Sequence, residues 1–173
     1  MSNSGFLNQD LEPKKSRPKF LLVLVVLSTI NIVFSTIGTL GAVFGVKPDQ
    51  QLIDKLEKDF ATMREQFSAI GGDQFIGLIN QMEEMAMNLF DHFQSYNTLQ
   101  LLFLILGLYG VRLMYLAKRL GFHFYILYCL GLLLMPYLFN PFSTVPVIFT
   151  IFGILYSGLW VFLYSRNLHW MKD

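Results

Sequence analysis

The stretch FLLVLVVLSTINIVFSTIGTLGAVFGV, residues 20–46, contains no Asp, Glu, Lys or Arg. A second run without charged residues extends from Leu120 to Ser165. About 20 consecutive apolar residues cross the hydrocarbon core of a bilayer as one α-helix. The first run is therefore long enough to cross once, and the second is long enough to cross twice. These runs indicate an integral membrane protein, in agreement with a composition that is 54% hydrophobic and 14% charged.

Adding the apolar segment that follows the central charged region, we predict an all-α integral membrane protein with four transmembrane helices. The predicted helices are residues 20–46, 97–117, 120–139 and 146–165. Between the last two, Asn140-Pro141 favours a turn and Pro146 suits the start of a helix. Because Pro136, Pro141 and Pro146 recur every five residues, one alternative stays open: this region is re-entrant and does not cross fully.

The charged region, residues 47–96, has two segments whose apolar residues recur at intervals of three and four, as in a helical packing face. Gly71 and Gly72 can turn the chain between the segments, and Asp73 can cap the second helix. We predict an extracytoplasmic amphipathic helical hairpin, or alternatively two helices lying flat on the lipid. Since residues 90–101 contain neither Gly nor Pro, the second helix is expected to continue into the next span.

Basic residues give the orientation, because cytoplasmic segments carry an excess of Lys and Arg. We therefore expect a disordered cytoplasmic leader at residues 1–19, a cytoplasmic tail at 166–173 and both termini in the cytoplasm, with a bacterial inner membrane as the location. Tyr125, Trp160 and Tyr164 are assigned to an aromatic belt at the cytoplasmic interface. The basic residues lie before the first span, between the second and third, and after the fourth: Lys14, Lys15, Arg17, Lys19, Lys118, Arg119, Arg166 and Lys172.

Small and polar residues recur along the first span at intervals of three and four. Such a face lets helix backbones approach closely, and its polar members can hydrogen-bond across the contact. We predict a helix-packing face in which Asn31 points toward protein rather than lipid. A pore-lining role would need the same face. The six residues are Ser28, Asn31, Ser35, Gly38, Ala42 and Gly45, and possible counterparts are Gly107, Gly110, Gly153, Ser157 and Gly158.

Arg112 is the charged residue closest to the interior of a predicted span. Its position near the end of that span lets the guanidinium reach the headgroup region. The functional alternative is contact with an anionic lipid or with a carboxylate of a partner protein.

The sequence offers little for catalysis or metal binding. Cys129 is the single cysteine, so the chain has no CxxC pair, and the GxSxG and HExxH patterns are absent. His123 and His169 would lie near the same face, which leaves haem ligation as a weakly supported alternative. We expect no catalytic residue, no metal site and no cofactor. The spans also lack Asp and Glu, which disfavours ion-coupled transport.

These patterns lead us to expect a non-enzymatic membrane interaction or scaffold subunit, which docks through the predicted hairpin and the helix-packing face. The expected partners are the lipid bilayer and either other membrane protein subunits or further copies of this chain, and nothing points to nucleic acid. A channel or transporter component is the alternative. A membrane enzyme or cofactor carrier is less favoured.

Overall fold

The computed structural model describes residues 18–45 and 47–172, so most of the predicted leader lies outside the described residues. The described part is all-helical, with two short 3-10 turns at Asp73–Phe75 and Leu168–Trp170. The six α-helices are α1 (Lys19–Phe44), α2 (Gln50–Ala69), α3 (Ile76–Asp91), α4 (Phe93–Tyr115), α5 (Leu120–Phe139) and α6 (Val147–Ser165).

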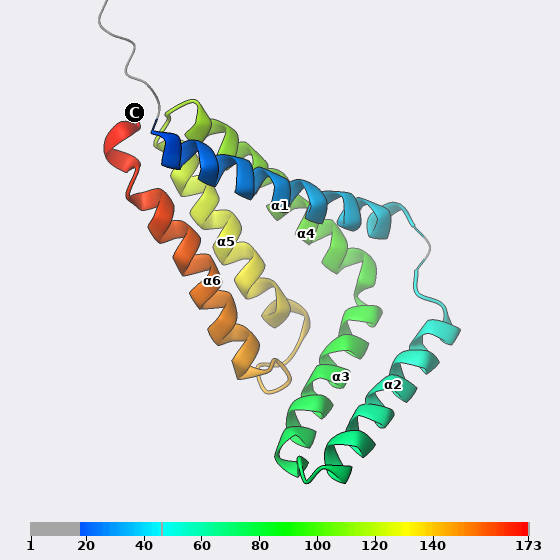
Figure 1. Ribbon diagram of the computed structural model, residues 1–173. Coiled ribbons are helices and arrows are strands. Elements are labelled where there is room, and N and C mark those ends of the chain that lie inside the picture. The colour runs from blue at the N-terminus through cyan, green and yellow to red at the C-terminus, as the bar shows by residue number, and fades with distance from the viewer. Residues whose placement is uncertain (1–17, 46, 173) are drawn as a thin grey trace, which may run out of the picture.

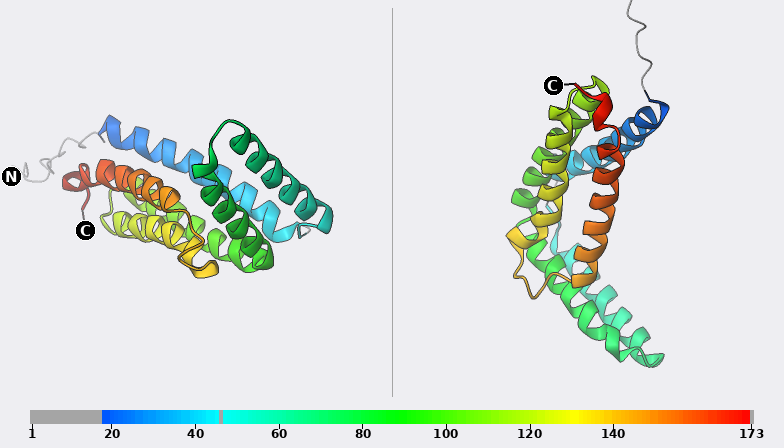
Figure 2. Two further views of the ribbon diagram at one scale, coloured as in Figure 1. Left: turned by 90° about the horizontal axis from the view of Figure 1, so that it is seen from below. Right: turned by 90° about the vertical axis from the view of Figure 1, so that its left-hand side faces the viewer.

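Four of these helices, α1, α4, α5 and α6, are long and apolar enough to span a membrane. This confirms the predicted number of apolar helices. In the bundle, α4 packs against both α1 and α5, α5 also packs against α6, and α1 meets α6 over a short stretch (Figure 1). The start of α1, the α4–α5 turn and the C-terminal segment lie at one end, and the α5–α6 loop and the α2–α3 pair lie at the other (Figures 1 and 2).

Glycines bring α4 and α5 close together. A Cβ placed on Gly110 would lie 3.0 Å from the Gly121 carbonyl oxygen, and one placed on Gly107 would lie 2.8 Å from the Tyr128 ring. A Cβ on Gly121 would lie 2.6 Å from the Met114 nitrogen. The backbones can therefore approach only because these side chains are absent, as is common between membrane helices. Sequence analysis identified Gly107 and Gly110 but missed Gly121.

The end of α4 is closed by a turn with a left-handed residue. The Lys118 N–H donates to the Leu113 carbonyl and the Ala117 N–H to the Met114 carbonyl, each at 3.0 Å. These two bonds form a Schellman motif, in which Gly is the usual left-handed residue. Here that position is occupied by Ala117, at φ +60°.

The C-terminal segment pairs with this turn. The Lys172 N–H donates to the Ala117 carbonyl at 2.8 Å, and the Arg119 N–H donates to the Lys172 carbonyl at 3.1 Å. The Arg119 Nε–H donates to the Met171 carbonyl at 3.2 Å. These bonds hold basic residues from two distant parts of the sequence at the same end of the bundle.

The helices α2 and α3 lie side by side and run in opposite directions (Figure 1). The Leu52 N–H donates to the Asp49 carboxylate at 2.9 Å, which caps α2. Gly71 turns the chain at φ +73°, as its sequence position predicts. The prediction that Asp73 caps α3 is wrong: α3 has no side-chain cap, and the Asp73 carboxylate accepts a hydrogen bond from the Ser68 hydroxyl at 2.7 Å.

The expected continuous helix from α3 into α4 is also wrong. The chain bends at His92, which has φ −104° and ψ 19° and ends α3 without any Gly or Pro. The His92 ring lies 5.7 Å from the Phe139 ring at the end of α5. The bend turns α3 toward the α5–α6 loop, so contacts distant in sequence override the local helical preference.

The left-handed conformation of Ala117 gives a first prediction. Ala117→Gly removes the steric cost of a Cβ at positive φ and should raise the free energy of unfolding by about 0.5 to 1 kcal/mol. The same change at Ala86, inside α3, should lower it by at least about 0.5 kcal/mol. Thermal unfolding in detergent, followed by circular dichroism, measures both. Equal effects of the two variants would contradict the left-handed conformation of Ala117.

Candidate functional site

A cluster of three hydroxyl groups joins α1, α5 and α6. The Tyr164 hydroxyl donates to Ser28 Oγ at 3.0 Å, and the Tyr125 hydroxyl lies 3.4 Å from the same oxygen. The Tyr125 and Tyr164 rings are 4.8 Å apart. All three residues are buried, and Tyr164 is 0% exposed. Since an unpartnered hydroxyl is costly in hydrocarbon, this cluster fixes where the three helices meet.

Beside this junction lies a cavity of about 240 Å³ between α5, α6 and Ser28 and Asn31 of α1. Its α5 wall extends from Tyr125 to Tyr137, a rise of about 18 Å along a helix. Its α6 wall is one helical face, comprising Phe149, Thr150, Gly153, Tyr156, Ser157 and Trp160. The cavity is therefore a narrow cleft parallel to the helices.

Polar groups without protein partners line the cleft toward the junction. The side chains of Asn31, Tyr128, Tyr156 and Ser157 make no hydrogen bond to other described residues. Tyr128 lines the cavity and is only 7% exposed. None of the described lining residues carries a formal charge. The cleft thus combines an apolar wall with a few neutral hydrogen-bonding groups.

The structure separates the six predicted packing residues of α1. Ser28 is buried against α5 and α6, whereas Asn31, Gly38 and Gly45 are exposed and Ser35 and Ala42 are half-buried. Ser35 donates its hydroxyl to the Asn31 carbonyl at 2.9 Å. The side of α1 buried within the chain comprises Leu21, Leu24, Val25, Ser28, Ile32 and Thr39. Packing of the other five residues against a further helix stays a prediction.

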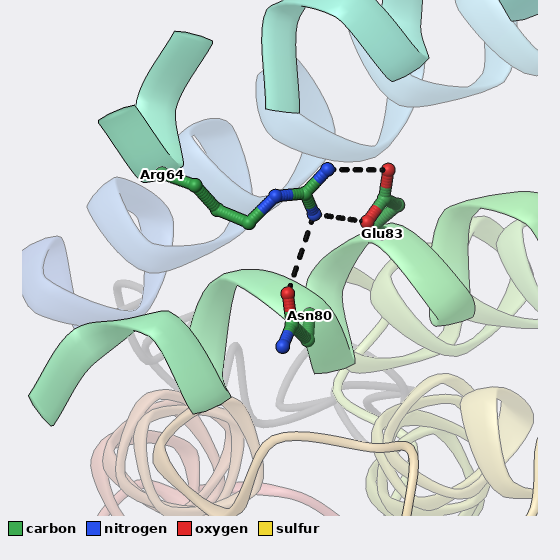
Figure 3. Close-up of polar contacts among 3 residues, drawn as sticks. All are labelled: Arg64, Asn80 and Glu83. Carbon is green, nitrogen blue, oxygen red and sulfur yellow. Dashed lines mark hydrogen bonds and ion pairs between the residues drawn. The ribbon is translucent and has the colours of Figure 1, made fainter. Parts of the chain in front are cut away.

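An ion pair links α2 to α3. The Arg64 guanidinium contacts both carboxylate oxygens of Glu83 and also donates to Asn80 Oδ1 at 3.3 Å (Figure 3). The hydrogen bonds to Glu83 raise the pKa of Arg64 above its usual value. Phe60 of α2 and Ile79 of α3 are the buried residues of the two helices.

The α2–α3 pair is also attached to the bundle. Gln81 Nε2 donates to the Ser143 carbonyl at 2.8 Å, and the Thr144 hydroxyl donates to the Glu84 carboxylate at 2.9 Å. Ser143 and Thr144 belong to the α5–α6 loop, whereas Gln81 and Glu84 belong to α3. We refer to residues 50–91, held in this way, as the α2–α3 arm.

Arg112 lies exposed in the last turn of α4, with no side-chain partner among the described residues. Its contact with an anionic lipid or a partner stays a prediction. His123 and His169 are both exposed, and His123 Nδ1 lies 3.3 Å from the Arg119 carbonyl oxygen. The described residues contain no group of three or more His, Cys, Asp or Glu side chains placed to hold a metal ion.

Sequence reasoning missed the tyrosines of the junction. It assigned Tyr125 and Tyr164 to an interfacial belt because aromatic residues gather there, but both are buried between helices. Tyr125, Tyr128 and Cys129 share one face of α5 at helical spacing, which was the available signal. The spacing alone does not say whether this face is buried, because its burial depends on the packing of α6 against α5.

Comparisons with protein families, curated proteins and solved structures found no match for this chain.

The junction gives a second prediction. Tyr164→Phe removes one interhelical hydroxyl and leaves the ring in place, so it should lower the free energy of unfolding by about 0.5 to 1.5 kcal/mol. Tyr109→Phe is the matched control, because Tyr109 is exposed and its hydroxyl has no partner among the described residues. Unfolding by SDS from mixed micelles measures both. Similar stability of the two variants would show that the junction does not stabilise the bundle.

Proposed function

We propose that this protein is a non-enzymatic, multi-pass membrane interaction or scaffold subunit of a larger membrane complex. It docks on its partners through the α2–α3 arm and through the exposed small residues of α1. The single observation that carries the proposal is the arm: an amphipathic helix pair that projects from the bundle, is attached to it by side-chain hydrogen bonds, and exposes apolar side chains at its tip.

The tip of the arm is the turn between α2 and α3. Ile70 is 78% exposed there, and Phe75 is 44% exposed while its ring lies 5.6 Å from that of Phe67. Apolar side chains exposed together at one turn can bury their surface against a partner, which favours association. The bonds from Gln81 and Glu84 to the α5–α6 loop hold the arm, so its tip is presented in a defined direction.

The small residues of α1 supply the second contact. A Cβ placed on Gly38 or Gly41 would meet no atom within 4 Å, so the helix backbone is bare on this side. Within the chain, α4 covers a different face. A second membrane helix can approach this bare surface closely, and small residues favour such approach.

The same proposal includes an orientation. The end of the bundle that holds Lys118, Arg119 and Lys172 faces the cytoplasm, since positively charged segments stay on that side. The arm then lies outside the cytoplasm, and a bacterial inner membrane fits this arrangement. Contact of Arg112 with anionic headgroups fits the same orientation.

The α1 surface gives a third prediction. Gly38→Leu fills open space, so it should leave the fold intact and block close approach by a partner helix, with an expected loss of at least about tenfold in co-purified partner or self-associated chain. Gly158→Leu on α6 is the matched control, because Gly158 also has no atom near its Cβ position. Quantitative mass spectrometry after mild detergent extraction measures the loss. Equal recovery with both variants would exclude this contact.

The arm tip gives a fourth prediction. Ile70→Ser removes an exposed apolar side chain from the tip and should weaken partner association about threefold to tenfold. Leu52→Ser is the control, since Leu52 is similarly apolar and 47% exposed but lies at the other end of α2. Association is measured by crosslinking in native membranes. If Ile70→Ser associates as well as Leu52→Ser, the tip takes no part in docking and this role is wrong.

A further inference from the structure

We propose that the cleft between α1, α5 and α6 binds an uncharged quinone-type lipid, whose flat ring lies beside Asn31 and Tyr128 and whose hydrocarbon chain extends along α5 and α6. This inference goes beyond the proposed docking function. It involves Asn31, one of the predicted packing residues of α1, but neither Gly38 nor Gly41, on which the docking contact of α1 depends. It depends on four features of the cleft: its neutrality, its unpartnered donors, its division into a polar and an apolar part, and its dimensions.

The charge of the cleft limits the ligand class. No described lining residue is charged, and a charged headgroup at this depth would lack a counter-ion. Its free polar groups are amides and hydroxyls: Asn31, Tyr128, Tyr156 and Ser157. Each of them can donate a hydrogen bond. A neutral ligand with carbonyl oxygens, which only accept hydrogen bonds, therefore matches these groups.

The polar and apolar parts of the cleft follow each other along the helices. A Cβ on Gly153 would lie 2.8 Å from Leu133, so these residues face each other in the middle of the cleft. Toward the junction lie the unpartnered donors of α1, α5 and α6. In the other direction lie Pro136, Val145 and Phe149, together with Tyr137 and Thr150, whose hydroxyls are hydrogen-bonded to each other and are therefore already satisfied within the protein. A ligand with one polar end and one hydrocarbon end is accommodated in this orientation.

The polar part is also rich in aromatic rings. Tyr128, Tyr156 and Trp160 line it, and the Tyr156 and Trp160 rings lie 6.3 Å apart in an edge arrangement. Aromatic rings pack well against another flat ring. A volume of about 240 Å³ is just below the range of about 300 to 1,000 Å³ for small-molecule sites. It fits a ring and the first part of a chain, and the remaining chain lies among lipids.

Access is lateral, because α1 and α6 meet over only a short stretch near Ser28 and Tyr164. Asn31 and Tyr156, on either side of the cleft, are both exposed. A lipid-soluble ligand can therefore enter from the bilayer without opening the α4–α5 contact.

The test uses the tryptophan at the cleft. Trp160 and Trp170 are the two tryptophans of the chain, so Trp170→Phe leaves Trp160 as the sole reporter. The full-length variant in lipid nanodiscs is titrated with decylubiquinone, and Trp160 fluorescence should be quenched saturably. In the Trp160→Phe variant, where Trp170 alone reports, quenching should be weak and proportional to concentration. Proportional quenching in both would show only partition into the bilayer and would overturn the proposal.

Substitutions then locate the ring. In the Trp170→Phe background, Asn31→Leu and Tyr128→Phe should each weaken decylubiquinone binding about threefold to tenfold, since each removes one hydrogen-bond donor. Asn31 is exposed, so its replacement should not disturb folding even if that of Tyr128 does. Thr36→Val is the control, because the Thr36 hydroxyl is bonded to the Ile32 carbonyl and does not line the cleft. Unchanged affinity in Asn31→Leu would overturn the assignment of the ring position.

Competition with a ligand that lacks the ring tests the chemical class. Decanol and a short-chain diacylglycerol should not displace decylubiquinone at equal concentration. Displacement by either would show that the cleft takes hydrocarbon chains without selecting a quinone ring, and the proposal would be wrong. Because partner association is not measured here, failure of this proposal is independent of failure of the docking function.

Discussion

The bundle depends on one constraint, which is that a hydroxyl group placed among apolar helices is costly unless it has a hydrogen-bond partner. Ser28, Tyr125 and Tyr164 meet this requirement jointly, each from a different helix. Their bonds fix the point at which α1, α5 and α6 come together. Away from that point α1 and α6 follow different directions, because they share little further contact.

The unequal packing of the four apolar helices follows from this arrangement. α4 and α5 approach closely because Gly107, Gly110 and Gly121 present no side chains between them. α6 has no comparable contact, and most of its surface is exposed. The contact between α4 and α5 is thus the most extensive one in the bundle. The looser contact leaves the cleft along α5, and the side chains that line it remain available to a ligand.

The arm is a separate consequence of long-range contacts. Heptad spacing makes α2 and α3 amphipathic, but it does not set their direction relative to the bundle. That direction is set by the bonds of Gln81 and Glu84 to the α5–α6 loop and by the contact of His92 with Phe139. The bend at His92 is needed for these bonds. An arm held in this way carries Ile70 exposed at its tip, in a direction that the contacts with the bundle set.

The sequence by itself determined the all-helical class, the four apolar helices and the turn at Gly71, because length, hydropathy and glycine conformation are local properties. Only the tertiary structure decided which residues meet. The bend at His92, the closeness of Gly121 to α4, and the burial of Tyr125 and Tyr164 depend on contacts between segments far apart in the sequence. The spacing on α1 likewise marked Ser28 and Asn31 as one face. Only the positions of α5 and α6 place Ser28 in a buried junction and Asn31 at an open cleft, since a helical repeat gives the angle of a side chain and not its neighbour.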